Sequence, residues 1–92
     1  MKEFYIDTTK KLKEIFKDHC NLSTEQFEEL REELVFLVTD YQEEEPKEEV
    51  EKRINYLTVV IDFLYNTGAI TLCENYDLHG LVDEIKTEGE KP

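Results

Sequence analysis

The sequence contains few of the residues from which most enzyme active sites are built. Of its 92 residues only three are glycine, two are cysteine and two are histidine, and Ser23 is the only serine. The glycines are isolated, so no glycine-rich loop is present to hold a phosphate group. A cysteine nucleophile would need the fold to bring Cys20 to His79, or Cys73 to His19. We therefore interpret the protein as non-enzymatic and expect no cofactor.

Patterns typical of metal sites are also missing. His19, Cys20, Cys73 and His79 have the residue types of a zinc site, but their spacings match no zinc module. Residues 40–51 lack the central glycine of an EF-hand loop. Carboxylates over residues 43–49 would at most hold a divalent cation loosely, and a solvated acidic tip is the simpler interpretation. We predict no metal site, and two reduced thiols.

Long apolar segments are absent as well. No run of about 18 apolar residues is present to cross a membrane, and the first residues lack the apolar core of a signal peptide. We expect a cytoplasmic protein without membrane contact. Ala69 is the only alanine while lysine, isoleucine and asparagine are frequent, which is typical of AT-rich genomes. This composition points to a low-GC bacterium, or to one of its phages or mobile elements.

Basic residues are scarce, and the resulting negative charge is concentrated in one third of the chain. The protein has 11 lysine and arginine residues against 23 aspartate and glutamate residues, a net charge of −12. The net charge is +1 over residues 1–20, −10 over residues 21–51 and −3 over residues 52–92. Such a charge opposes direct binding to nucleic acid or to anionic membranes, because both are polyanions. A basic protein partner is the expectation.

The apolar residues recur with helical spacing and predict four helices within one acidic domain over residues 1–92. The helices are expected over about residues 3–19, 23–43, 46–66 and 71–87, followed by a frayed tail over 88–92. Ser23 with Gln26, and Thr71 with Glu74, form capping-box patterns at two of the starts. Asp7 is an alternative N-cap for the first helix, which would leave residues 3–6 extended.

These helices predict an all-α fold, a small bundle of three long helices plus a shorter C-terminal helix. The second and third helices must form an antiparallel hairpin, since only Glu44 and Glu45 separate them. Both helices are apolar over a wider surface than the seam of a two-helix contact can bury. The first and fourth helices would cover the remainder, or a second copy of the chain would, as a homodimer.

The hairpin also carries an unusual row of acidic residues. Five glutamates between residues 25 and 33 recur at helical spacing, over about 12 Å of helix, or one carboxylate per about 2.4 Å. Duplex DNA has one charge per about 1.7 Å, which is comparable. Residues 43–45 add three glutamates at the C-terminal end of the helix, where each is disfavoured by about 0.3–1 kcal/mol. A placement that costs stability is a pointer to function, although acidic surfaces also serve solubility alone.

Two classes of function follow from this sequence. The first is a small acidic inhibitor that masks a basic, nucleic-acid-binding surface of a partner protein, as phage-encoded anti-defence and immunity-type proteins do. The alternative is a helical adaptor or chaperone that binds a partner helix through apolar hairpin surface. Tyr41, beside the acidic tip, is the candidate aromatic anchor for the first class. The candidate partner-binding residues are Glu25, Glu28, Glu29, Glu32, Glu33, Asp40, Tyr41, Glu43, Glu44, Glu45, Glu48 and Glu49.

Overall fold

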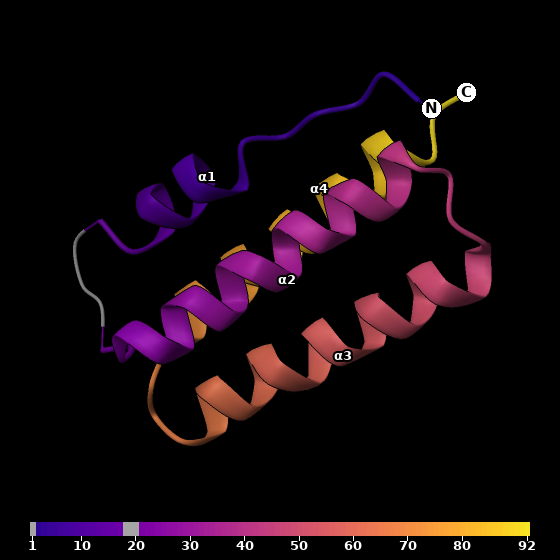
Figure 1. The fold of residues 1–92 in the computed structure, drawn as a ribbon. Helices are drawn as coiled ribbons and strands as arrows, with labels where there is room; N and C mark the ends of the chain where they lie inside the picture. Colours follow the sequence, from indigo (N-terminus) through magenta and orange to yellow (C-terminus); the bar gives the residue numbers. More distant parts are fainter. Residues whose placement is uncertain (1, 18–20) are drawn as a thin grey trace.

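The computed structural model describes residues 2–17 and 21–92 of the chain, and these residues form a helical bundle (Figure 1). Its four helices are α1 (Thr8–Ile15), α2 (Thr24–Gln42), α3 (Lys47–Asn66) and α4 (Leu72–Gly89). No strand occurs within the described residues. The predicted all-α bundle is confirmed, and α2 and α3 form the predicted antiparallel hairpin (Figure 1).

The starts of α2 and α4 lie where their capping boxes predict. At α2 the Ser23 hydroxyl accepts from the Gln26 amide at 3.1 Å, and the Gln26 side chain accepts from the Ser23 amide at 3.0 Å. At α4 the same reciprocal pair joins Thr71 and Glu74 at 3.1 and 2.7 Å. Each box satisfies two backbone donors that the first turn would otherwise leave unpaired. Both helices are therefore fixed at the start by their own sequence.

The predicted lengths of the first and fourth helices need correction. α1 has two turns and begins at Thr8, because the Asp7 carboxylate accepts from the Lys10 amide at 3.0 Å and caps the helix there. Residues 2–6 are extended, as the alternative cap implied. The short helix is thus the first one, whereas α4 runs for 18 residues to Gly89 and includes part of the predicted tail. His19 and Cys20 lie outside the described residues.

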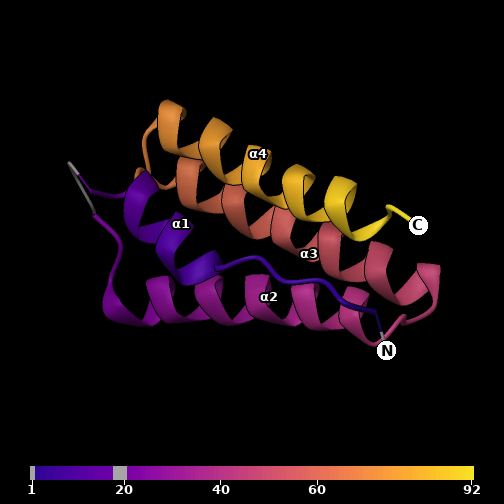
Figure 2. The same ribbon diagram turned by 90° about the horizontal axis from the view of Figure 1, so that it is seen from above.

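The extended N-terminal segment completes the bundle where α1 stops. Its Lys2 amide donates to the Gln42 carbonyl at 2.9 Å, and the Gln42 side chain donates to the Phe4 carbonyl at 2.6 Å. The Lys2 ammonium also donates to the carbonyl groups of Gly89 and Lys91. These bonds attach the first residues to the end of α2 and to the end of α4, which lie side by side (Figures 1 and 2).

The core lies between the four helices, and α2 packs against each of the other three. The predicted seams of the hairpin, over residues 27–41 of α2 and 50–64 of α3, are buried except for Phe27 and Ile54, which are partly buried against the core. The largest fully buried side chains come from all four helices: Leu12, Leu30, Leu34, Leu37, Leu57, Ile61, Leu78 and Ile85.

The outward side of α3 is not covered by another helix. α1 packs against α2 and α4, and within the described part of the chain it makes no contact with α3, from which α2 separates it (Figure 1). α3 is covered by α2 and α4 alone, so its remaining surface faces solvent. In residues 2–17 and 21–92 no helix is both long and apolar enough to cross a membrane.

Candidate protein-binding surface

The acidic row of α2 is exposed along most of its length, but some of its carboxylates are already bonded. Glu25, Glu28, Glu29 and Glu32 are exposed. Glu28 accepts two bonds from the Arg31 guanidinium, at 2.8 and 3.1 Å. This ion pair lies within one helix, raises the pKa of Arg31 through its hydrogen bond and charge, and cancels one charge of the row. The row stays negative, with Arg31 offsetting one of its five glutamates.

Arg53 of α3 binds two of the predicted site residues inside the hairpin. It donates to Glu33 at 2.9 Å and to Asp40 at 2.5 Å, and all three side chains are half-buried. Burial alone would lower the pKa of Arg53, but the hydrogen bonds and charges of Asp40 and Glu33 outweigh it and raise the pKa. The guanidinium also lies 5.2 Å from the ring centroid of Phe36. Glu33 and Asp40 therefore hold α2 against α3.

The hairpin tip exposes the other carboxylates. The side chains of residues 43–45, Glu48 and Glu49 are all solvent-exposed. The turn closes through backbone bonds from the Glu44 amide to the Tyr41 carbonyl at 3.2 Å and from the Glu45 amide to the Asp40 carbonyl at 3.0 Å. Glu44 has a φ of 56°, the left-handed conformation in which a helix commonly ends. The tip is thus a hydrogen-bonded turn whose carboxylates are exposed.

Tyr41 does not have the role predicted for it. Only 9% of the residue is exposed, so it is a core residue and is not available to anchor a partner. The Phe4 ring lies edge-on to it, with centroids 6.0 Å apart, and Gly89 packs against its face. Its hydroxyl has no hydrogen-bond partner among the described residues. Burial first, and then the charges of Glu90 and Asp40, raise the pKa of Tyr41 to about 12.

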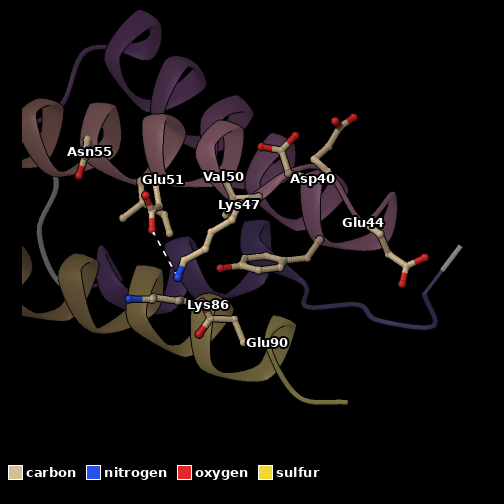
Figure 3. Close-up of a pocket in the computed structure, with 11 residues that line it drawn as sticks. Asp40, Glu44, Lys47, Val50, Glu51, Asn55, Lys86 and Glu90 are labelled. Atoms are coloured by element: carbon tan, nitrogen blue, oxygen red, sulfur yellow. Dashed lines mark ion pairs between the residues drawn. The ribbon is translucent and has the colours of Figure 1, made fainter.

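A cleft of about 830 Å³ separates the tip from the end of α4 (Figure 3). Lys47 of α3 and Lys86 of α4 both line it, and Lys47 pairs with Glu51 at 4.0 Å (Figure 3). Carboxylates and ammonium groups both line the cleft, so charges of both signs face it. The cleft adjoins the acidic tip through Glu44 and Glu45, and Tyr41 is also among its lining residues.

An apolar surface accompanies the acidic one and was not among the predicted site residues. Tyr56, Val59 and Phe63 of α3 are 47%, 66% and 59% exposed, and Phe36 of α2 is 46% exposed. We call these four side chains the outer stripe. The excess apolar width of the two helices was the signal for it. These residues of α3 stay uncovered because α1 packs on the opposite side of the bundle, against α2 and α4.

The remaining titratable cluster joins α3 to α4. The His79 ring lies 2.8 Å from the Asp62 carboxylate, to which the Asn75 amide donates at 3.2 Å. These two bonds, that of His79 first, lower the pKa of Asp62. Among residues 2–17 and 21–92 no group of three or more possible ligands is placed to hold a metal ion. The free thiol of Cys73 is exposed, and its suggested zinc partners His19 and Cys20 lie outside the described residues.

Comparison of the chain with protein-family models, curated proteins and solved structures finds no match.

Proposed function

We propose that the protein is a non-enzymatic interaction protein that binds a basic surface of a partner protein and competes with nucleic acid for it. One observation carries this proposal, the nine exposed carboxylates that lie along α2 and at the tip of the hairpin. They belong to Glu25, Glu28, Glu29, Glu32, Glu43, Glu44, Glu45, Glu48 and Glu49.

The physical support is electrostatic. A surface of one charge sign speeds the encounter with an oppositely charged cleft and raises specificity more than affinity. Glu33 and Asp40 contribute less than the others, because Arg53 neutralises part of their charge inside the hairpin. The net charge of −10 over residues 21–51 already counts Arg31 and Lys47. Lys52 and Arg53, which pair with this segment from outside it, leave it strongly negative.

Charge-neutralising variants test the proposal. One variant changes Glu25, Glu28, Glu29 and Glu32 to glutamine, and a second changes Glu43, Glu44 and Glu45. The matched control neutralises four exposed acids near α4: Asp77, Asp83, Glu88 and Glu90. Binding is measured to the partner isolated from the native host, with a DNA oligonucleotide as competitor.

We expect both hairpin variants to bind about tenfold more weakly, a loss of about 1.4 kcal/mol, and the control to bind like the parent. Salt should weaken the parent complex, because the Debye length falls from about 10 Å at 0.1 M to about 3 Å at 1 M. A complex that ignores salt, and that both hairpin variants form normally, would refute the proposal.

A second candidate function is supported by the outer stripe. In that case the protein is an adaptor or chaperone that binds a partner helix by apolar contact alone, and the acids serve solubility. Val59 and Phe63, both more than half exposed, favour this alternative. The two functions differ in their salt response, since an apolar complex should not weaken as ionic strength rises.

A further inference from the structure

We infer that the outer stripe is the apolar anchor of the binding site and that it receives a cationic amphipathic α-helix of the partner. This inference rests on the proposed function, and it names the structural element of the basic partner that docks. It also replaces Tyr41, which is buried, as the source of apolar contact.

The outer stripe has the dimensions of a helix-docking surface. Tyr56, Val59 and Phe63 are at positions i, i+3 and i+7 of α3, so they form a line of about 10 Å along the helix. Phe36 of α2 lies beside the guanidinium of Arg53, which is one turn before Tyr56 on α3. Single exposed apolar residues are common on proteins, but successive aromatic and branched side chains on one helix face suit a contact surface.

Carboxylates lie on both edges of the outer stripe. On the α2 side, Glu29 accepts the Tyr56 hydroxyl at 2.7 Å, which fixes that carboxylate beside the ring and raises the pKa of Tyr56. On the other side Asp62 lies one turn from Val59, and its bond to His79 holds it in place. A ligand centred on the outer stripe therefore has a carboxylate on each side of it, Glu29 on one side and Asp62 on the other. This arrangement favours a partner with cations along both edges of its apolar face.

A helix meets this requirement better than an extended segment does. In a helix, residues at i, i+3 and i+7 share one face, and lysine or arginine at neighbouring positions projects to both sides of it. In a strand, side chains alternate between opposite faces, so cations next to apolar anchors would point away from the protein. The arrangement of apolar centre and acidic edges thus fits the helix-docking mode of peptide recognition.

The charge also disfavours a second copy of this chain as the occupant. In a symmetric dimer the outer stripes would face each other, and the carboxylates at their edges would be brought together. Each copy carries a net charge of −12, so the approach is repulsive over the whole molecule. A cationic helix would cover the same apolar surface, and its charge would attract the carboxylates at the edges.

The test uses three labelled peptides of about 18 residues, or about five helical turns. The first is built from leucine and lysine with leucine at helical spacing, and the second has the same composition in scrambled order. The third keeps the leucine spacing but replaces each lysine by glutamate. Fluorescence anisotropy gives the affinity of each for the full chain, at low and at high salt.

Variants of the chain locate the binding surface. Val59→Gln with Phe63→Gln removes the centre of the outer stripe, and both residues are exposed, so the fold should persist. The matched control is Tyr5→Gln with Tyr76→Gln, which removes two equally exposed aromatic side chains elsewhere. Thermal melts verify that both variants are folded.

We expect the amphipathic lysine peptide to bind about tenfold more tightly than the scrambled peptide, and to lose about tenfold in affinity with the stripe variant only. Equal, salt-sensitive binding of both lysine peptides, unchanged by the stripe variant, would overturn this inference and leave the proposed function standing. Binding of the glutamate peptide as tightly as the lysine peptide would refute the charge selection on which both rest. Failure of all three peptides to bind, or a stripe-dependent dimer in sedimentation equilibrium, would overturn the inference.

Discussion

Arg53 and Arg31 both pair with glutamates of α2, but in different surroundings. Arg53 is half-buried and bridges two helices through Glu33 and Asp40, whereas Arg31 pairs with Glu28 within one helix at the surface. Arg53→Met would leave two half-buried carboxylates without their cation, and we expect it to lower the free energy of unfolding by about 1–2 kcal/mol. Arg31→Met should change it little, because exposed ion pairs contribute weakly.

Urea denaturation of the two methionine variants measures the difference. A third variant, Glu28→Gln, removes the surface pair from its other side and should resemble Arg31→Met. Equal losses of stability for the two arginine variants would contradict the structural role assigned to Arg53.

The buried hydroxyl of Tyr41 predicts a pH dependence in the alkaline range. Its pKa is raised to about 12 in the folded protein, so the folded state keeps the proton while an unfolded tyrosine loses it near pH 10. The contribution of Tyr41 is therefore fully present below about pH 10 and is lost between about pH 10 and pH 12. Tyr41→Phe should remove this component, which a comparison of unfolding free energies of parent and variant at successive pH values detects. Parallel curves would show that Tyr41 ionises freely.

The error about Tyr41 shows which part of a site the sequence leaves undetermined. Helical spacing placed Tyr41 on the seam of α2, and its neighbourhood in the chain suggested an exposed anchor at the tip. Its burial comes from Phe4 and Gly89, which are 37 and 48 residues away along the chain. Likewise the partners of Glu33 and Asp40 depend on how α3 is aligned with α2, and periodicity does not specify that alignment.

Helix starts were more predictable than helix lengths. The capping boxes at Ser23 and Thr71 are local patterns of four residues, and the structure confirms both. The predicted start of α1 was wrong because the apolar spacing continues through Asp7 without a break. Periodicity alone therefore extended the predicted helix to residue 3. The competition between continuing the helix and capping it at Asp7 is decided by tertiary contacts of residues 2–6, such as the bond to Gln42.

Alanine substitutions at the two glycines of α4 should have opposite effects on the free energy of unfolding. At Gly80 an added Cβ meets nothing within 4 Å, so Gly80→Ala should raise the free energy of unfolding by about 0.5–1 kcal/mol through helix propensity. At Gly89 the added Cβ would lie 2.5 Å from the Tyr41 ring. Gly89→Ala should therefore lower stability by about 1–3 kcal/mol through overpacking.

Thermal and chemical denaturation of the two alanine variants measure both effects on one helix. The double variant Gly89→Ala with Tyr41→Ala separates propensity from overpacking, because the clash requires the ring. If Gly89→Ala stabilises the protein as Gly80→Ala does, the close contact between Gly89 and the Tyr41 ring is contradicted.

At the level of the whole molecule, the position of one short helix determines which surface of the hairpin is left exposed. The sequence showed that α2 and α3 are apolar beyond their shared seam, and it offered two covers, the remaining helices or a second copy. Because α1 packs against α2 and α4 and not against α3, it covers neither Val59 nor Phe63. The excess apolar surface therefore remains on the outside of the hairpin, beside the acidic row of α2.

The uneven charge of the molecule predicts that salt stabilises the fold. Repulsion among the acids of residues 21–51 opposes folding, and salt screens it because most of these side chains are exposed. The melting temperature should rise between about 0.01 M and about 0.15 M salt, as the Debye length falls from about 30 Å to about 8 Å. Each change of about 1 kcal/mol in the free energy of unfolding corresponds to about 4–8 °C in melting temperature for a domain of this size.

Changing Glu43, Glu44 and Glu45 together to glutamine should raise the melting temperature at low salt and flatten its salt dependence, since these residues also oppose the dipole of α2. If the melting temperatures of parent and variant change in parallel with salt, the tip carboxylates do not destabilise the fold. Their position at the helix end would then give no indication of function.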